Sequence, residues 1–504
     1  MESLVKLHNI SKSFGTVQAN KDVCMELKRG EILALLGENG SGKTTLMNML
    51  SGIYYPDSGT ISVEGKEVII RSPKDAFELG IGMIHQHFKL VDVLTAAENI
   101  ILGLKGSMLI NRKKLANEIR EISEKYGFSI DPYKKIYDMS VSEKQKVEIV
   151  KVLYRGADLL VLDEPTAVLT PQESDILFDM LRKMKEDGKA IIIITHKLNE
   201  VLSLSDRVCI LRKGELVGEL ETKDATVQSL TEGMVGRAVN LEILRETGSL
   251  GDERITVTGL TCLNDDGIKA LDSVSFGLRA GEILGVAGIA GSGQKELCES
   301  LTGLYPIDSG NIFFTNDGAQ SELRGLSPTE IAKKGVHMAF VPEDRLGMGL
   351  VAGLDMVDNM MLKSYHDEKG FLIDRKKPKD AAERLIKTLE IVTPGVSTPV
   401  RRLSGGNVQK VLLGREIESR PLVLVVAYPV RGLDINSSYT IYNLLNEQRK
   451  AGVAVLFIGE DLDVLIELCD RIMVLCGGRV SGIVDATTTT KEELGLMMTQ
   501  VSDE

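Results

Sequence analysis

Short runs of apolar residues alternate along this chain with segments in which apolar and charged residues follow a helical spacing. Segments 111–126 and 173–187 have that spacing and predict helices. The strand-length apolar runs of the first half are "EILALLG" (31–37), "LLVLDEP" (159–165), "AIIIIT" (190–195) and "RVCIL" (207–211). This alternation predicts an α/β fold with a parallel sheet covered on both faces. Segments 90–155 and 350–420 are richer in helix formers and predict a helical subdomain in each half.

The chain repeats itself over a long period. Residues 30–61, "GEILALLGENGSGKTTLMNMLSGIYYPDSGTI", align without a gap with residues 281–312, "GEILGVAGIAGSGQKELCESLTGLYPIDSGNI", at a displacement of 251 positions. Further along, the displacement becomes 264, so that His196 corresponds to Glu460. A period this long indicates two homologous domains and not a solenoid, and 504 residues are too many for one typical domain. We expect a first domain at 1–243, a polar linker at 244–254 and a second domain at 255–504.

Composition restricts the possible locations and partners. A net charge of -12 argues against a nucleic-acid-binding protein. The six cysteines form no CxxC pair, which favours buried thiols in a reducing compartment. The N-terminus lacks the pattern of a signal peptide, and no uncharged apolar run reaches the roughly 18 residues that a membrane span needs. We therefore expect a cytoplasmic protein whose membrane role, if any, requires a partner.

A phosphate-binding loop is predicted at residues 37–44. "GENGSGKT" fits the pattern GxxxxGK[ST] and lies between a predicted strand and a helical segment. Its glycines let successive backbone N–H groups converge on phosphate oxygens, and the following helix adds its positive end. Lys43 supplies a charge for the β- and γ-phosphates, while the Thr44 hydroxyl suits Mg²⁺. The candidate nucleotide-binding residues here are Gly37, Glu38, Asn39, Gly40, Ser41, Gly42, Lys43, Thr44 and Thr45.

Two acids at the end of a predicted strand complement this loop. Asp163 is suited to hold Mg²⁺ through water, and Glu164 beside it could polarise an attacking water. An isolated Asp-Glu pair is usually only solvated, but its place after a phosphate loop favours the functional interpretation. Gln86 and His196, taken alone, would be a surface glutamine and a core or edge histidine.

Together these motifs resemble an ATP-binding-cassette (ABC) ATPase. The order is phosphate loop, Gln86, a signature segment, "LLVLDEPT" and "ITH", and "LSGGNVQKV" (403–411) is similar to the LSGGQ signature of that family. Two fused cassettes, with "VPEDR" (341–345) and "RGLD" (431–434) in the second, resemble the energising subunit of bacterial sugar and nucleoside importers. Segment 85–103 is most similar to the nucleoside branch, which pairs with basic-membrane-protein lipoproteins. The resemblance covers nearly the whole chain.

The resemblance implies a fold, cofactors and residue roles. Each domain would be a P-loop NTPase with a RecA-like parallel-sheet core and a helical subdomain, and ATP and Mg²⁺ would be the cofactors. Glu164 would be the general base, His196 would contact the γ-phosphate and Gln86 would contact the water or Mg²⁺. Phe14 falls where an aromatic residue stacks on adenine, although it could instead be a core residue. The Mg²⁺ ligands would be Thr44, Gln86 and Asp163.

The second half has lost most of this chemistry. The lysine position of its loop is Gln294, which brings no positive charge to phosphates. The counterparts of the other catalytic residues are Glu343 for Gln86, Ala427 for Asp163, Tyr428 for Glu164 and Glu460 for His196. Hydrolysis at this second site is therefore not expected.

The signature segments degenerate in the opposite direction. The first half has Val141 and Ser142 where the second half has Gly405 and Gly406, and only glycines let the backbone approach a γ-phosphate closely. Because ABC cassettes resemble each other in pairing head to tail, one composite site would be complete and the other would be dead. The complete site would join the first-half motifs to Ser404, Gly405, Gly406 and Asn407. The cassettes could pair within one chain or between two copies.

The resemblance implies an ATPase on the cytoplasmic face of the cell membrane, as a peripheral subunit. It would drive import of a nucleoside-like solute through a separate transmembrane permease, with an extracytoplasmic solute-binding lipoprotein as an indirect partner and no nucleic-acid partner. A monosaccharide is the alternative solute. A soluble ABC protein acting on ribosomes or DNA is disfavoured by the short linker and the lack of sustained heptads. A non-enzymatic scaffold is disfavoured by the intact first-half motifs.

Overall fold

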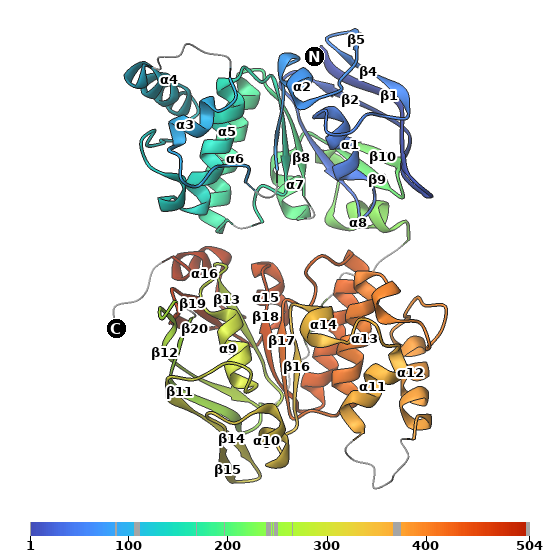
Figure 1. Ribbon diagram of the computed structural model, residues 1–504, viewed down its shortest axis with the longest axis vertical. Coiled ribbons are helices and arrows are strands. Elements are labelled where there is room, and N and C mark those ends of the chain that lie inside the picture. Colours follow the sequence, from blue (N-terminus) through green and yellow to red (C-terminus); the bar gives the residue numbers. More distant parts are fainter. Residues whose placement is uncertain are drawn as a thin grey trace. The chain divides into compact units, whose positions relative to one another are not determined.

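The computed structural model forms two compact units, Met1–Asn240 and Leu241–Glu504 (Figure 1). The residues that it describes are 2–85, 88–104, 111–167, 169–195, 197–237, 243, 245, 250–264, 266–365 and 374–499. Across these ranges no helix is long and apolar enough to cross a membrane. Each unit contains a six-stranded sheet, a four-stranded sheet and helices.

The apolar runs of the first unit form its six-stranded sheet, in the order β10-β9-β3-β8-β7-β6. Neighbouring strands are parallel except at the β9–β10 edge. Alternate residues of β8 enter two different apolar clusters, which shows that both faces of the strand are buried. The predicted parallel core is thus confirmed. Its strands are β3 (Ile32–Leu36), β6 (Ile81–Ile84), β7 (Leu159–Asp163), β8 (Ala190–Ile194), β9 (Arg207–Arg212) and β10 (Glu215–Glu221).

A four-stranded antiparallel sheet, in the order β2-β1-β4-β5, accompanies this core. It was not predicted from the sequence. Its inward residues join α1 and one face of β3 and β8 in a single apolar cluster, so this sheet covers the face that helices were expected to cover. Its strands are β1 (Ser3–Phe14), β2 (Val17–Lys28), β4 (Ser58–Val63) and β5 (Lys66–Val68).

The helices of the first unit lie where the sequence indicated. The predictions for 111–126 and 173–187 correspond to α4 (Arg112–Lys125) and α6 (Pro171–Glu186). Helices α3, α4 and α5 lie together to one side of the core as the predicted helical subdomain (Figure 1). The other helices are α1 (Lys43–Leu50), α2 (Pro73–Glu78), α3 (Ala96–Ile101), α5 (Val141–Tyr154), α7 (Leu198–Leu204) and α8 (Val227–Val235), with short 3₁₀ turns at Ile136–Asp138 and Thr222–Asp224.

The second unit repeats this architecture. Its sheets run β16-β17-β18-β13-β19-β20 and β12-β11-β14-β15. The strands are β11 (Glu253–Leu263), β12 (Lys269–Arg279), β13 (Ile283–Gly288), β14 (Ser309–Asn316), β15 (Ala319–Glu322), β16 (Met338–Val341), β17 (Val423–Ala427), β18 (Ala454–Ile458), β19 (Arg471–Cys476) and β20 (Arg479–Asp485). The helices are α9 (Gln294–Leu301), α10 (Pro328–Lys333), α11 (Met356–Ser364), α12 (Lys376–Thr388), α13 (Gly405–Glu418), α14 (Ile435–Lys450), α15 (Leu462–Leu468) and α16 (Lys491–Met497), with a π turn at Arg345–Gly349 and a 3₁₀ turn at Val400–Arg402.

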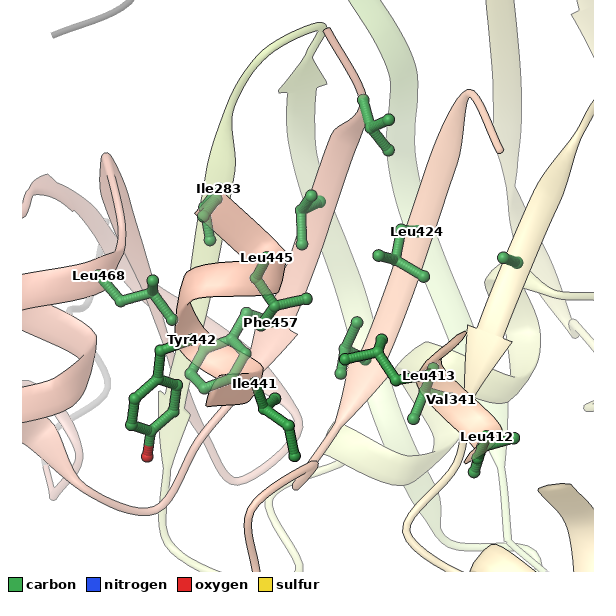
Figure 2. Close-up of a cluster of buried hydrophobic side chains, with 14 of the residues drawn as sticks. Ile283, Val341, Leu412, Leu413, Leu424, Ile441, Tyr442, Leu445, Phe457 and Leu468 are labelled. Atoms are coloured by element: carbon green, nitrogen blue, oxygen red, sulfur yellow. The ribbon is translucent and has the colours of Figure 1, made fainter. Parts of the chain in front are cut away.

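The core of the second unit is well packed behind its degenerate motifs. Figure 2 shows side chains of α13 and α14 against strands β16, β17 and β18. The Tyr442 and Phe457 rings meet edge to face with centroids 6.4 Å apart. Burial of this apolar surface stabilises the second unit independently of any nucleotide chemistry.

Candidate functional site

The loop between β3 and α1 has a backbone that only glycine can adopt at two positions. Gly37 has φ +154°, and a Cβ there would lie 2.2 Å from the Leu211 carbonyl oxygen. Gly42 has φ +99°, and a Cβ there would lie 2.2 Å from the Ala19 carbonyl oxygen. The sequence expectation that glycines shape this loop therefore has a steric basis. Of the remaining candidates, Glu38, Asn39, Gly40 and Ser41 lie in the loop, and Thr44 and Thr45 lie in the first turn of α1.

Lys43 folds over its own loop. Its ammonium donates to the carbonyl oxygens of Gly37 at 2.6 Å and Glu38 at 3.0 Å. Burial lowers the pKa of Lys43 from its usual value, although the negative charges of Glu164 and Asp163 oppose that shift. The buried Ser41 hydroxyl has no hydrogen-bond partner among the described residues. An unpartnered hydroxyl and a cation beside a curled backbone fit a phosphate group.

Asp163 and Glu164 stand at the end of β7, as expected. Burial, and then the charge of Glu164, raises the pKa of Asp163 to about 6, while Lys43 opposes the rise. Glu164 has φ +48°, in the left-handed region that is costly for a residue with a side chain. Its N–H donates to the carbonyl of Ile194 at the end of β8 at 2.8 Å. A bound cation would relieve the repulsion between the two acids, so the donor set fits Mg²⁺.

Gln86 and His196 lie outside the described residues. The strands that precede them, β6 and β8, flank β7 on either side in the parallel sheet.

Phe14 ends β1, and 44% of its surface is exposed, so it is not a core residue. Its ring meets Tyr54 edge to face, with centroids 5.1 Å apart and an interplanar angle of 68°. The Lys12 ammonium lies 5.7 Å from the centroid of the Phe14 ring. On β2, the Asn20 side-chain amide donates to the Gly42 carbonyl at 3.3 Å, which joins this hairpin to the phosphate loop. Tyr54 could not be identified as a candidate from the sequence because it belongs to no motif.

The corresponding loop of the second unit keeps its shape but not its charge. Gly291 and Gly293 have φ +88° and +98°, close to the values of the matching Gly40 and Gly42. Gln294 occupies the lysine position, is buried, and donates its amide to the Ile289 carbonyl at 3.0 Å. The second loop therefore keeps the backbone conformation that its glycines allow, but it has no lysine ammonium at the position of Lys43.

The end of β17 also keeps the backbone of its first-unit counterpart. Tyr428 has φ +47°, and its N–H donates to the Ile458 carbonyl at 2.9 Å. The left-handed conformation of Glu164 is therefore reproduced at a residue with a phenol in place of a carboxylate.

An ion-pair network, which we name the Arg431 network, joins the degenerate positions of the second unit. The Arg431 guanidinium pairs with Glu343 and, through Nε at 3.1 Å, with Glu460. It also lies 5.9 Å from the centroid of the Tyr428 ring. Although partial burial opposes it, the two carboxylates raise the pKa of Arg431. From the sequence, Glu343 and Glu460 could be identified only as replacements of the candidate catalytic residues Gln86 and His196. Nothing in the sequence indicates that Arg431 connects them.

The two signature segments begin equivalent helices. Ser404 caps α13, and its hydroxyl accepts the side-chain amide of Asn407 at 2.8 Å. Gly405 and Gly406 are the first two helical residues, and Ser404 and Gly405 are exposed. In the first unit the counterpart helix α5 begins at Val141 and is capped by Ser140. The start of α13 therefore carries no side chain at the two positions where the start of α5 carries those of Val141 and Ser142.

Comparisons with known proteins match this picture. Residues 20–167 and 271–427 both match the family model described as ABC transporter. The chain is 42% identical to a guanosine import ATP-binding protein of Bacillus subtilis and, separately, 42% identical to a nucleoside import ATP-binding protein of Lactococcus lactis; each alignment covers 99% of this chain and 98% of the relative. It is 39% identical to a ribose import ATP-binding protein of Streptomyces avermitilis, over 98% of this chain and 93% of the relative. The chain therefore belongs to the ABC transporter family, as an ATPase with two fused ATP-binding cassettes.

Proposed function

We propose that this ATPase drives the import of a nucleoside-like solute through a separate membrane permease, with one hydrolysing site. The observation that carries the solute class is the 42% identity, over nearly the full length, to two relatives named for guanosine and nucleoside import. A sugar is the alternative solute, because relatives named for ribose and glucose import are 39% and 38% identical. The proposed domains are 1–243 and 255–504, with the linker at 244–254.

In the proposed site, the first phosphate loop binds the triphosphate of ATP. Backbone N–H groups of the loop and the end of α1 would hold the phosphates, with the Lys43 ammonium redirected from its own loop carbonyls to them. Thr44, Gln86 and Asp163 would hold Mg²⁺, which supplies charge stabilisation to the phosphates. The phenyl ring of Phe14 would stack on the base. These assignments rest on the cradle geometry and the raised pKa of Asp163.

Hydrolysis in this proposal depends on Glu164. Its carboxylate would accept a proton from the attacking water, with Gln86 orienting that water and His196 contacting the γ-phosphate. Ser404, Gly405, Gly406 and Asn407 would bring N–H groups to the γ-phosphate from the paired cassette, of the same chain or of a second copy. Two observations support the proposal that the other site does not hydrolyse ATP. Gln294 brings no positive charge to its loop, and the two carboxylates nearby, Glu343 and Glu460, are paired with Arg431. Ala427 and Tyr428 replace the acid pair.

We place the permease contact at a cavity of about 200 Å³ in the first unit. Ile53, Phe77, Met83 and Val152 supply apolar lining, and Arg155 lies with its guanidinium carbon 5.1 Å from the centroid of the Phe77 ring. The buried Nε of Arg155 has no hydrogen-bond partner within the described part of the chain. The same guanidinium donates through Nη2 to the Leu102 carbonyl. Because the charged side chains of Lys89, Glu148 and Lys151 also line the cavity, it suits a permease segment that carries an apolar side chain flanked by polar ones.

This arrangement would make the protein a peripheral subunit at the cytoplasmic face of the membrane. A solute-binding lipoprotein on the other side would act on it only through the permease.

The test is reconstitution with the permease that co-purifies with the protein. ATPase activity is measured with guanosine, adenosine, ribose or glucose, each with its binding protein. Stimulation by nucleosides alone supports the proposal, whereas stimulation by sugars alone favours the alternative. Complete absence of ATPase activity in the assembled complex would instead indicate a non-enzymatic scaffold.

A further inference from the structure

The Phe14 ring has its position fixed by a second aromatic residue. Phe14 is at the end of β1, where 44% of its surface is exposed. Its ring packs edge to face against the ring of Tyr54, with the two ring centroids 5.1 Å apart. Edge-to-face pairs of this geometry are attractive beyond their buried area. Without that contact, the torsion of an exposed ring at a strand end would have little to restrict it.

Tyr54 is itself attached to the phosphate-loop helix. The backbone N–H groups of Ile53 and Tyr54 both donate to the Asn48 carbonyl in α1, at 2.8 and 3.1 Å. Helix α1 starts at Lys43, directly after the loop. One continuous segment therefore carries the phosphate cradle at one end and the Tyr54 ring at the other.

A second link joins the same segment to Phe14. Asp57 accepts hydrogen bonds from the Ser13 N–H and the Lys12 ammonium, both at 2.7 Å. Lys12 in turn lies 5.7 Å from the Phe14 ring centroid. These contacts hold the backbone on the N-terminal side of the ring.

The second unit shows which of these features the fold alone requires. Leu304 and Tyr305 repeat the backbone bonds of Ile53 and Tyr54, both donating to Glu299. The Tyr305 hydroxyl, however, donates to the Leu263 carbonyl at 2.9 Å. The tyrosine is thus tied to backbone in the unit whose corresponding segment, "LNDDG" (263–267), has no aromatic residue.

We infer that Tyr54 is a positioning residue for the nucleotide base: it sets the orientation of the Phe14 ring and, through α1, fixes where that ring stands relative to the phosphate cradle. The inference rests on the proposed stacking of Phe14 on the base. The ligand is any nucleotide whose base reaches Phe14, so the contribution is common to ATP and ADP and absent from a phosphate chain without a base.

The experiment measures binding of ATP, ADP and inorganic tripolyphosphate to the full-length protein by calorimetry. Tyr54→Leu and Tyr54→Met remove the ring, and Tyr54→Phe retains it. We expect either ring-removing change to weaken ATP and ADP binding about 2- to 10-fold, the factor that corresponds to one aromatic pair. Tripolyphosphate binding should not change, and Tyr54→Phe should bind ATP like the unaltered protein.

Matched controls separate positioning from stability. Tyr305→Phe removes the hydroxyl bond of the counterpart tyrosine and should leave ATP binding unchanged. An equal loss of tripolyphosphate affinity in Tyr54→Leu would overturn the inference, because it would show that the change disturbs the phosphate loop. Unchanged ATP affinity in both ring-removing variants would overturn it as well.

Phe14→Ala separates the positioning role inferred for Tyr54 from the proposed stacking of Phe14 on the base. Weaker ATP binding in Phe14→Ala together with normal binding in Tyr54→Leu refutes only the role of Tyr54. Normal binding in Phe14→Ala refutes base stacking and the inference together. Since the chain has no tryptophan, Phe14→Trp also introduces a single tryptophan, which can be excited apart from the tyrosines and whose anisotropy should fall when Tyr54→Leu is added.

Discussion

Alanine in place of Gly405 should lower ATP hydrolysis by a factor of about 10² to 10³ without destabilising the protein. Gly405 is the first residue of α13, and a Cβ there would meet only the guanidinium of Arg345, at 3.3 Å from its Nη1. That guanidinium donates through Nη2 to the Arg431 carbonyl. Alanine is favoured over glycine within a helix by about 0.5–1 kcal/mol. At the first helical position, with a small shift of Arg345, we expect a gain of at most about 0.5 kcal/mol. For a domain of this size that corresponds to a change in Tm below about 2 °C.

The expected loss of activity has a different origin. A methyl group on Gly405 would separate the start of α13 from the γ-phosphate that it is proposed to contact. Loss of one such donor in other enzymes lowers kcat by about 10² to 10³. The assay compares thermal unfolding of the isolated protein with ATPase activity of the reconstituted complex. Normal hydrolysis by Gly405→Ala would refute the idea that this helix end contacts the γ-phosphate.

Val141→Gly is the matched control, at the same position of helix α5 in the first unit. It should lower the free energy of unfolding by about 0.5–1 kcal/mol and leave hydrolysis unchanged. A loss of hydrolysis as large as that of Gly405→Ala would mean that both helix ends serve live sites.

Three further variants test other parts of the site. Glu164→Gln should lower hydrolysis by at least about 100-fold while calorimetry still detects ATP binding; hydrolysis at the normal rate would exclude Glu164 as the base. Gly42→Ala places a Cβ 2.2 Å from the Ala19 carbonyl oxygen at φ +99°, so it should cost about 2 kcal/mol or more in urea unfolding and eliminate ATP binding. Arg431→Gln removes two partly exposed ion pairs, so it should cost about 1 kcal/mol or less and leave hydrolysis unchanged; a large loss of hydrolysis would assign the Arg431 network a role in the live site.

The parallel cores and the longer helices could be predicted because local pattern determines them. Runs such as "AIIIIT" are apolar on both sides of a strand, and α4 and α6 follow a helical spacing that is visible within fifteen residues. The phosphate loop and the acid pair could be predicted because glycines and acids at fixed offsets have few other uses.

The antiparallel sheet could not be predicted in the same way. Strand β1 is interrupted at Asn9, which has φ +49°, and its pairing with β2 changes register between Leu7 and Ile10. These irregularities break the alternation that marks a strand with one buried face. Its pairing with β4 joins residues about fifty positions apart, which no local pattern records.

Side-chain contacts between residues that are far apart in the chain could not be predicted from the sequence either. Arg431 pairs with Glu343, 88 positions earlier, and nothing in either segment indicates the other. Tyr54 occurs in both repeats as tyrosine, yet only its three-dimensional neighbours distinguish a ring beside Phe14 from a hydroxyl on backbone.

The most direct test of a single hydrolysing site compares Lys43→Ala with Gln294→Ala, the same position of the two loops. Each variant is reconstituted with the permease in vesicles, and solute uptake is measured with ATP inside and solute outside. We expect Lys43→Ala to abolish uptake and Gln294→Ala to change it only modestly. Equal loss of uptake in the two variants would contradict a single hydrolysing site.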